Sequence, residues 1–291
     1  RLGAARLSRA VLALALLSCS AGSATAPEEA AVSVAVPKDG GIGGLSAIHV
    51  YPGGERFLAL SDRAYFVEGR LLRDEGRLTG VEIDGRRDLI DFDGSPLGRW
   101  KGDSEGLAVA PDGRIWTSFE GIARVRIEDR GDGLPERLPA VPGAERMQGN
   151  ASLEALAIGP DGSLWTIPER SGRYDRPFPV FKFDGTAWSV AFDLPRRGAF
   201  LPTGADIGPD GRLYILERDF TGLGFRSRIR RIDLDGTGES TVFESATGTH
   251  GNLEGISVWR DGAGELRATM VADDNNRSFQ RSEIVEIGLG D

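Results

Sequence analysis

Two stretches of the chain carry the same arrangement of carboxylates. In "DSEGLAVAPDGRIWTSFEG" (103–121), Glu105 and Glu120 flank two short apolar segments joined by an Asp-Gly turn. The stretch "SLEALAIGPDGSLWTIPER" (152–170) repeats this arrangement 49 residues later with Glu154 and Glu169. Clustered carboxylate oxygens suit hard cations such as calcium, and paired carboxylates also perform acid–base catalysis. The chemistry therefore depends on whether the fold brings these acids together.

The same spacing recurs five times. Gaps of 59, 49, 49 and 51 residues separate the turn glycines Gly54, Gly113, Gly162, Gly211 and Gly262. Each glycine lies between two short apolar segments, the second rich in aromatic residues, which is the pattern of a β-hairpin. Eight positions before the glycines stand Ser46, Glu105, Glu154, Thr203 and Glu254.

A period near 50 residues is typical of a four-stranded β-propeller blade. Weaker strand signals follow the hairpins at 124–129, 179–184 and 229–235. We predict an all-β chain forming a β-propeller of five four-stranded blades, with six blades as the alternative because the first gap is longer. A β-sandwich is the other architecture considered. Residues 31–36 and 283–289 are expected to pair and close the ring.

In a hairpin, the start of the first strand lies beside the end of the second. The prediction therefore pairs Glu105 with Glu120, Glu154 with Glu169, Thr203 with Glu217, Glu254 with Asp273, and Ser46 with Asp62. First strands line the central channel of a propeller, so all five pairs are expected at one mouth of that channel. Further oxygens are expected nearby from Asn150, Asp206, Asn252, Asp274 and Asn275.

Acids gathered at one mouth repel one another, and a bound cation removes that cost. Two histidines and a single cysteine leave oxygen as the main donor, which favours calcium over zinc. The predicted metal ligands are Glu105, Glu154, Glu254, Asp273, Asp274 and Asn275. The alternative is a solvated acidic rim without a cation.

Catalysis is predicted at the same mouth, by metal-activated water with a carboxylate of the rim accepting the proton. The candidate catalytic residues are Glu105, Glu154, Glu254 and His250, whereas His49 is expected to pack within a blade. The candidate substrate-binding residues are Arg63, Arg170, Arg218 and Arg281, because arginine grips phosphate and carboxylate. A small anionic substrate is therefore expected. The alternative is that each arginine only pairs with an acid of the neighbouring blade.

Residues 1–26 have the layout of a secretory signal peptide, with arginines before an apolar stretch (10–17) and then small residues. "LLSC" resembles a lipoprotein box, in which Cys19 would carry the lipid, and residues 27–291 form the domain. Without this leader the net charge changes from −9 to −12, which argues against nucleic acid or an anionic membrane surface as partner. We expect a monomer that is periplasmic or secreted, tethered to the membrane if Cys19 is lipidated.

Several motifs stand at the hairpins in a characteristic order: "GGLSAI" (43–48), "SDR" (61–63), "DSEGLA" (103–108), "EALA" (154–157), "PTG" (202–204), "DGRLYILER" (210–218) and "NLEGISV" (252–258). In this order they resemble the bacterial "esterase-like activity of phytase" family from about residue 40 to the C-terminus. The resemblance implies a secreted or periplasmic propeller that hydrolyses phosphoesters or carboxylesters. More distantly, the chain is similar to calcium-dependent gluconolactonase and paraoxonase propellers. The alternative function is a non-catalytic binding propeller at the cell envelope.

Overall fold

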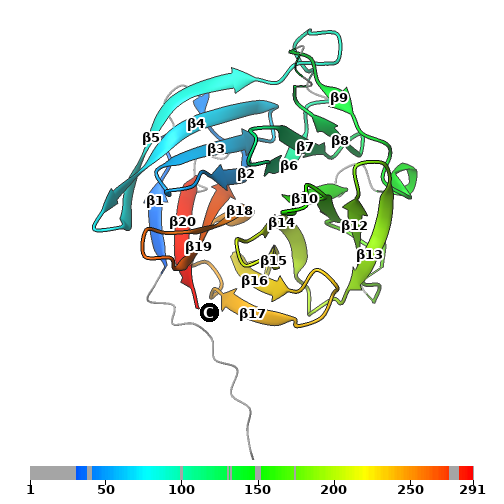
Figure 1. The fold of residues 1–291 in the computed structure, drawn as a ribbon. Helices are drawn as coiled ribbons and strands as arrows, with labels where there is room; N and C mark the ends of the chain where they lie inside the picture. The colour runs from blue at the N-terminus through cyan, green and yellow to red at the C-terminus, as the bar shows by residue number, and fades with distance from the viewer. Residues whose placement is uncertain are drawn as a thin grey trace, which may run out of the picture.

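The computed structural model describes residues 31–37, 41–98, 101–129, 131, 133–147, 152–173, 175–274 and 282–290. Its strands form five antiparallel four-stranded sheets in a ring, which is a five-bladed β-propeller (Figure 1). The prediction of five blades is confirmed, and the six-blade and sandwich alternatives are wrong. The predicted leader with Cys19, and also Asn150, Asn275 and Arg281, lie outside the described residues.

In each blade the four strands run in order from an inner strand at the channel to an outer strand. Blade 1 contains β2 (Leu45–Val50), β3 (Arg56–Ser61), β4 (Tyr65–Asp74) and β5 (Arg77–Asp88), and blade 2 contains β6 (Ser104–Val109), β7 (Ile115–Phe119), β8 (Arg124–Ile127) and β9 (Glu136–Arg137). Blade 3 contains β10 (Leu153–Ile158), β11 (Leu164–Pro168), β12 (Phe178–Phe183) and β13 (Trp188–Leu194), and blade 4 contains β14 (Leu201–Ile207), β15 (Leu213–Phe220), β16 (Phe225–Ile232) and β17 (Ser240–Glu244). Blade 5 contains β18 (Asn252–Arg260), β19 (Leu266–Asp273), β20 (Glu283–Leu289) and β1 (Val32–Ala35).

Among the described residues, no helix combines the length and the apolar character needed to cross a membrane.

Two segments that are far apart in the sequence close the ring. Strand β1 pairs antiparallel with β20, from Val32 opposite Glu286 to Ala35 opposite Glu283. The predicted pairing of residues 31–36 with the last strand is therefore confirmed. The longer first gap is taken up within blade 1, because β4 and β5 have 10 and 12 residues.

Tight turns join the inner strands to the second strands, as predicted. In blade 2 the turn glycine Gly113 has a φ of 88°, a conformation that glycine adopts without steric cost. In blade 5 the corresponding glycine is Gly264, with a φ of 85°, because β18 continues to Arg260. The fifth hairpin is therefore confirmed, but its predicted turn glycine, Gly262, is wrong by two positions.

The hydrophobic core lies between neighbouring sheets. Trp165 and Ile167 of blade 3, for example, pack in one cluster with Ile207 and Ile215 of blade 4. The recurring aromatic residues of the second strands are all buried in such clusters: Phe57, Trp116, Trp165 and Tyr214. Burial of these apolar faces holds the inner strands in place around the channel.

Every inner strand is irregular near its first residues. Its pairing with the second strand shifts register there, for example between Ser104 and Leu107 and between Leu253 and Gly255. A β-bulge of this kind redirects a side chain. Glu105, Glu154 and Glu254 stand within these irregular stretches, so the bulges help to set the direction of the predicted site residues.

A small residue follows each bulge: Ala47, Gly106, Ala155, Gly204 and Gly255. The three glycines lie where the backbone or side chains of a neighbouring inner strand approach closely. A Cβ atom on Gly255 would lie 2.5 Å from the Cα of Ala47, and one on Gly204 would lie 2.3 Å from the carbonyl oxygen of Glu254. Small residues therefore permit the narrow ring that brings the mouth residues together.

Gly255→Ala should lower the free energy of unfolding by about 1 to 3 kcal/mol, the usual cost of overpacking. The added methyl group meets backbone atoms of Ala47, which have no room to move aside. Gly262→Ala is the matched control, because nothing lies within 4 Å of a Cβ atom there. Urea unfolding measures both variants. Equal stability of the two would show that the inner strands have room to separate.

Candidate active site

One residue from the second strand of each blade is placed at the same end of the channel. Backbone pairing puts five residues in equivalent positions opposite the start of the inner strand: Asp62, Glu120, Glu169, Arg218 and Asp273. The inner strands add Ser46, Glu105, Glu154, Thr203 and Glu254 at the same end. We call this end the acidic mouth. The predicted convergence of the five hairpins on one mouth is confirmed, but in blade 4 the mouth position belongs to Arg218 and not to Glu217.

Glu217 was predicted at the acidic mouth, but its carboxylate lies inside blade 4. It pairs with Pro202, and its side chain accepts hydrogen bonds from Arg228 Nε at 2.8 Å and Arg230 Nε at 2.9 Å. The mouth position belongs to Arg218, which follows the turn glycine Gly211 by seven residues. Glu120 and Glu169 follow their own turn glycines by the same seven residues, so the spacing could have identified Arg218.

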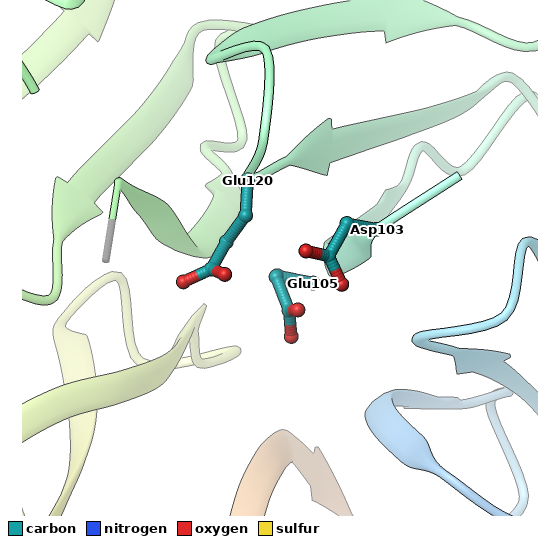
Figure 2. A group of neighbouring side chains, drawn as sticks. All are labelled: Asp103, Glu105 and Glu120. Carbon is teal, nitrogen blue, oxygen red and sulfur yellow. The ribbon is translucent and has the colours of Figure 1, made fainter. Parts of the chain in front are cut away.

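Three carboxylates of blade 2 converge at the acidic mouth. Asp103 precedes β6, Glu105 lies in β6 and Glu120 follows β7, and each offers an oxygen within 4.8 Å of the others (Figure 2). Glu105 is 9% exposed and Glu120 is 8% exposed. Asp103 was not among the predicted ligands. Its position at the start of the strand, two residues before Glu105, is the signal that could have identified it.

Burial and mutual repulsion act on the protonation of this group. Burial, followed by the charge of Glu254, raises the pKa of Glu105 well above its usual range, and Glu120, Asp103 and Asp62 act in the same direction. Burial also raises the pKa values of Asp103 and Glu120 and raises the pKa of Asp62 to about 7. Removing negative charge from this group, by protonation or by a bound cation, therefore relieves the repulsion between the carboxylates.

Glu154, in β10, connects this group to blade 3. Burial and repulsion from Glu105 raise the pKa of Glu154 well above its usual range. A side-chain hydrogen bond between Glu154 and Glu120 raises the pKa of Glu154 and lowers that of Glu120. The proton therefore resides on Glu154, and Glu120 accepts the hydrogen bond. Burial raises both pKa values, and the hydrogen bond separates them, which is an arrangement suited to acid–base catalysis.

Arg218 neutralises the other side of the mouth. Its Nη2 donates to Glu169 at 3.3 Å, and its Nη1 donates to Glu254 and Asn252. Burial lowers the pKa of Arg218, but Glu254, Glu154 and Glu169 more than offset this and raise it overall. Burial still raises the pKa of Glu254 to about 8, against the opposing effect of Arg218. The acidic mouth thus has a carboxyl-rich half on blade 2 and a half neutralised by Arg218.

The other predicted arginines that the structure describes lie beside acids of their own blades. Arg63 Nε is 3.7 Å from Asp62 Oδ1, and Arg170 Nε is 3.3 Å from Glu169 Oε2. Both side chains are more than a third exposed, at 39% and 47%. The positions of Arg63 and Arg170 leave part of each guanidinium in contact with solvent beside the mouth.

Three further predicted residues are described in the structure: His250, Asp273 and Asp274. His250 precedes β18, with its ring centroid 6.3 Å from that of Phe243. Asp273 holds the mouth position of blade 5, and the buried Asp274 accepts a hydrogen bond from the backbone N–H of Gly44 at 3.3 Å. Asp274 therefore faces the loop that leads into blade 1.

Asp206 was predicted near the acidic mouth but lies toward the opposite end of the channel. It lines a cavity of about 230 Å³ there, together with His49 and Ser257. One carboxylate oxygen accepts a hydrogen bond from the backbone N–H of Val258 at 2.7 Å. Burial raises the pKa of Asp206 to about 7 and lowers that of His49 to about 4. These two residues form no part of the acidic mouth.

The chain belongs to the phytase-like family, described as esterase-like activity of phytase, because the family model matches residues 40–276. The resemblance drawn from the hairpin motifs is thereby confirmed. None of the curated proteins is similar enough in sequence to count as a match.

Several solved structures are similar to the chain. A gluconolactonase from Xanthomonas campestris is 15% identical with a TM-score of 0.47, and the match covers 81% of this chain and 69% of that protein. Virginiamycin B lyase from Staphylococcus aureus is 15% identical with a TM-score of 0.46, covering 88% and 73%. The calcium-binding protein regucalcin from Agrobacterium tumefaciens is 14% identical with a TM-score of 0.43, covering 82% and 74%. Similarity at this level carries no argument about function.

Arg218→Met should destabilise the protein more at pH 8.5 than at pH 5, with a chelator present. The folded-state pKa of Glu254 is raised to about 8, so the stability linked to its protonated form is present at low pH and is lost as the pH rises through 8. Arg218 lowers the pKa of Glu254, so at pH 8.5 the variant must either bury the charge of Glu254 without a partner or bind a proton there, and losing one partner of a buried pair costs up to about 3 to 5 kcal/mol.

Urea unfolding at the two pH values measures this difference. Arg170→Met is the control, since an exposed ion pair contributes about 0 to 1 kcal/mol. An equal loss of stability at both pH values would show that Arg218 acts through packing rather than through its charge.

Proposed function

We propose that this phytase-like propeller is a hydrolase of phosphoesters or carboxylesters and that it works at the acidic mouth with a divalent cation. The observation that carries the proposal is the group formed by Asp103, Glu105 and Glu120. Their oxygens lie within 4.8 Å of one another, and the pKa values of all three are raised. A group with this electrostatic cost is expected where a cation is part of the working state.

The donor set fits calcium best. Calcium takes six to eight oxygen ligands at about 2.3 to 2.6 Å, including carboxylates and water. The group on blade 2 offers carboxylate oxygens only, and Glu154 and Glu254 lie within electrostatic reach of Glu105. The hydroxyl of Ser152, at the position of blade 3 equivalent to Asp103, is buried without a hydrogen-bond partner among the described residues. A buried hydroxyl of this kind is expected to gain its partner when water or another ligand binds at the mouth.

When bound, the cation would act as a Lewis acid toward a phosphoryl or carbonyl oxygen of the ester. The chain's own residues supply the rest of the chemistry. Glu154, whose pKa is raised well above its usual range, is placed to donate a proton to the leaving group. Glu120, the acceptor of the Glu154 hydrogen bond, is placed to accept a proton from the water that attacks the ester, as the bond to the protonated leaving group breaks. Arg170, exposed beside Glu169, is placed to hold an anionic part of the substrate.

The setting of this activity is part of the proposal. The leader predicted in residues 1–26 would deliver the propeller to the periplasm or the medium, and a lipid on Cys19 would tether it to a membrane. The acidic net charge supports a small-molecule substrate rather than a nucleic acid. A monomer is sufficient for this proposal, because all the residues named belong to one channel mouth.

Calcium should raise the melting temperature of the wild-type protein relative to protein with chelator. Binding at a hundred times the dissociation constant stabilises the folded state by about 2.7 kcal/mol, which corresponds to a shift of roughly 5 to 10 °C. Glu105→Gln should abolish most of this shift. It should also raise the melting temperature in chelator, because the substitution removes one of the mutually repelling carboxyls.

Glu265→Gln is the matched control, because Glu265 is exposed in the turn before β19, away from the mouth. Hydrolysis of p-nitrophenyl phosphate and p-nitrophenyl acetate is then measured for all three proteins with calcium and with chelator. Turnover that requires calcium and is lost in Glu105→Gln supports the proposal. Superimposable melting curves with and without calcium, together with no turnover, would contradict the proposal. They would favour the alternative of a non-catalytic binding propeller with a solvated acidic rim.

A further inference from the structure

The hairpin between β15 and β16 exposes apolar side chains at the mouth end of blade 4. Phe220 is 62% exposed and Leu223 is 95% exposed. The ring of Phe225 packs against that of Phe220, with centroids 5.1 Å apart. We call Phe220, Leu223 and Phe225 the apolar tip. Large apolar side chains gathered in one exposed place are typical of a binding surface.

Hydrogen bonds hold the apolar tip in a defined position. The backbone N–H and the hydroxyl of Thr221 both donate to the carbonyl of Gly224, at 3.0 and 3.1 Å. The backbone N–H of Gly248 donates to the carbonyl of Phe225 at 2.7 Å, which ties the hairpin to the segment before β18. The fold therefore presents these apolar side chains at a fixed place.

The apolar tip is continuous with the acidic mouth. Phe220 stands two residues after Arg218 in β15, so the two side chains share one face of the strand and lie about 7 Å apart along it. Arg218 itself reaches Glu169 and Glu254. The equivalent position in blade 2 is Ile122, which stands two residues after Glu120 and is 50% exposed. Exposed apolar side chains thus follow the mouth residues of both blades that flank blade 3.

We propose that the apolar tip binds the apolar group of an ester whose polar end lies in the acidic mouth. The inference rests on the proposed function and specifies its substrate class as amphiphilic esters. Phe220 lies about 7 Å along the strand from Arg218, a span that a hexyl group can cover and an acetyl or methyl group cannot.

The size and the charge of the surroundings favour a small molecule as the occupant. Three side chains supply far less than the roughly 800 Å² that each partner buries in a stable protein interface. The acidic net charge of the chain disfavours an anionic membrane surface. An amphiphile meets neither objection, because it is small and because its anionic or ester end is held by the proposed cation and by Arg170.

Binding of methylphosphonate and hexylphosphonate tests this without relying on turnover. Titration calorimetry with calcium present should show that hexylphosphonate binds at least about tenfold more tightly, since each fully buried methylene adds roughly fourfold to affinity. The double variant Phe220→Ser/Leu223→Ser should reduce the ratio of the two affinities to below about threefold. Its affinity for methylphosphonate should be unchanged.

The control is Val190→Ser, which removes an apolar side chain of similar exposure, 52%, from the outer strand of blade 3. Its affinity ratio should equal that of the wild type. A ratio near one in the wild type, or a ratio that survives the double variant, would overturn the inference while leaving the proposed hydrolase intact. Selective binding of hexylphosphonate by a protein without turnover would support the apolar tip and contradict the proposed hydrolysis. Binding of neither phosphonate would overturn both.

Size-exclusion chromatography distinguishes the remaining occupant, a second copy of the chain. A monomeric wild-type protein is expected. A dimer that becomes monomeric in Leu223→Ser would assign the apolar tip to self-association and overturn the inference.

Discussion

The close approach of buried carboxylates from neighbouring blades is the constraint on which the site depends. Gly204 and Gly255 let adjacent inner strands come nearer than any larger residue would allow. The same narrow ring brings Glu105 within electrostatic reach of Glu254, although the two belong to different blades. At low dielectric such repulsion raises pKa values and disfavours the folded state, so a neutralising charge is needed. The packing of the ring therefore creates the electrostatic condition that the mouth residues must meet.

The chain meets that condition differently on the two sides of the mouth. On one side Arg218 is a permanent cation, fixed by its hydrogen bonds to Glu169 and Glu254. On the other side burial raises the pKa values of Glu105 and Glu120, and we propose that a divalent cation supplies the neutralising charge there. A fixed charge serves structure, whereas an exchangeable one serves chemistry. In our proposal the reacting centre lies on the blade 2 side, whereas Arg218 links blade 4 to Glu169 of blade 3 and Glu254 of blade 5.

Much of the fold could be predicted from the sequence because its signals are local: apolar strands, turn glycines and a repeat near 50 residues. The inner carboxylates followed from strand direction alone. The wrong predictions concern the direction of individual side chains, which a shift of one residue along a strand reverses. Glu217 and Arg218 are adjacent, and a shift of one residue moves a side chain to the other face of its strand. Asp103 was missed because its role depends on three-dimensional convergence with Glu120, and Asp206 because it lies toward the other end of its strand.

Diffraction from crystals grown with calcium tests the central claim most directly, because it locates the cation by its anomalous signal. The account predicts a single cation at the acidic mouth, with oxygens of Glu105 and of at least one of Asp103 and Glu120 at about 2.3 to 2.6 Å. It also predicts that Arg218 remains bonded to Glu254. Absence of a cation at this mouth, or a cation that displaces Arg218 from Glu169 and Glu254, would contradict it.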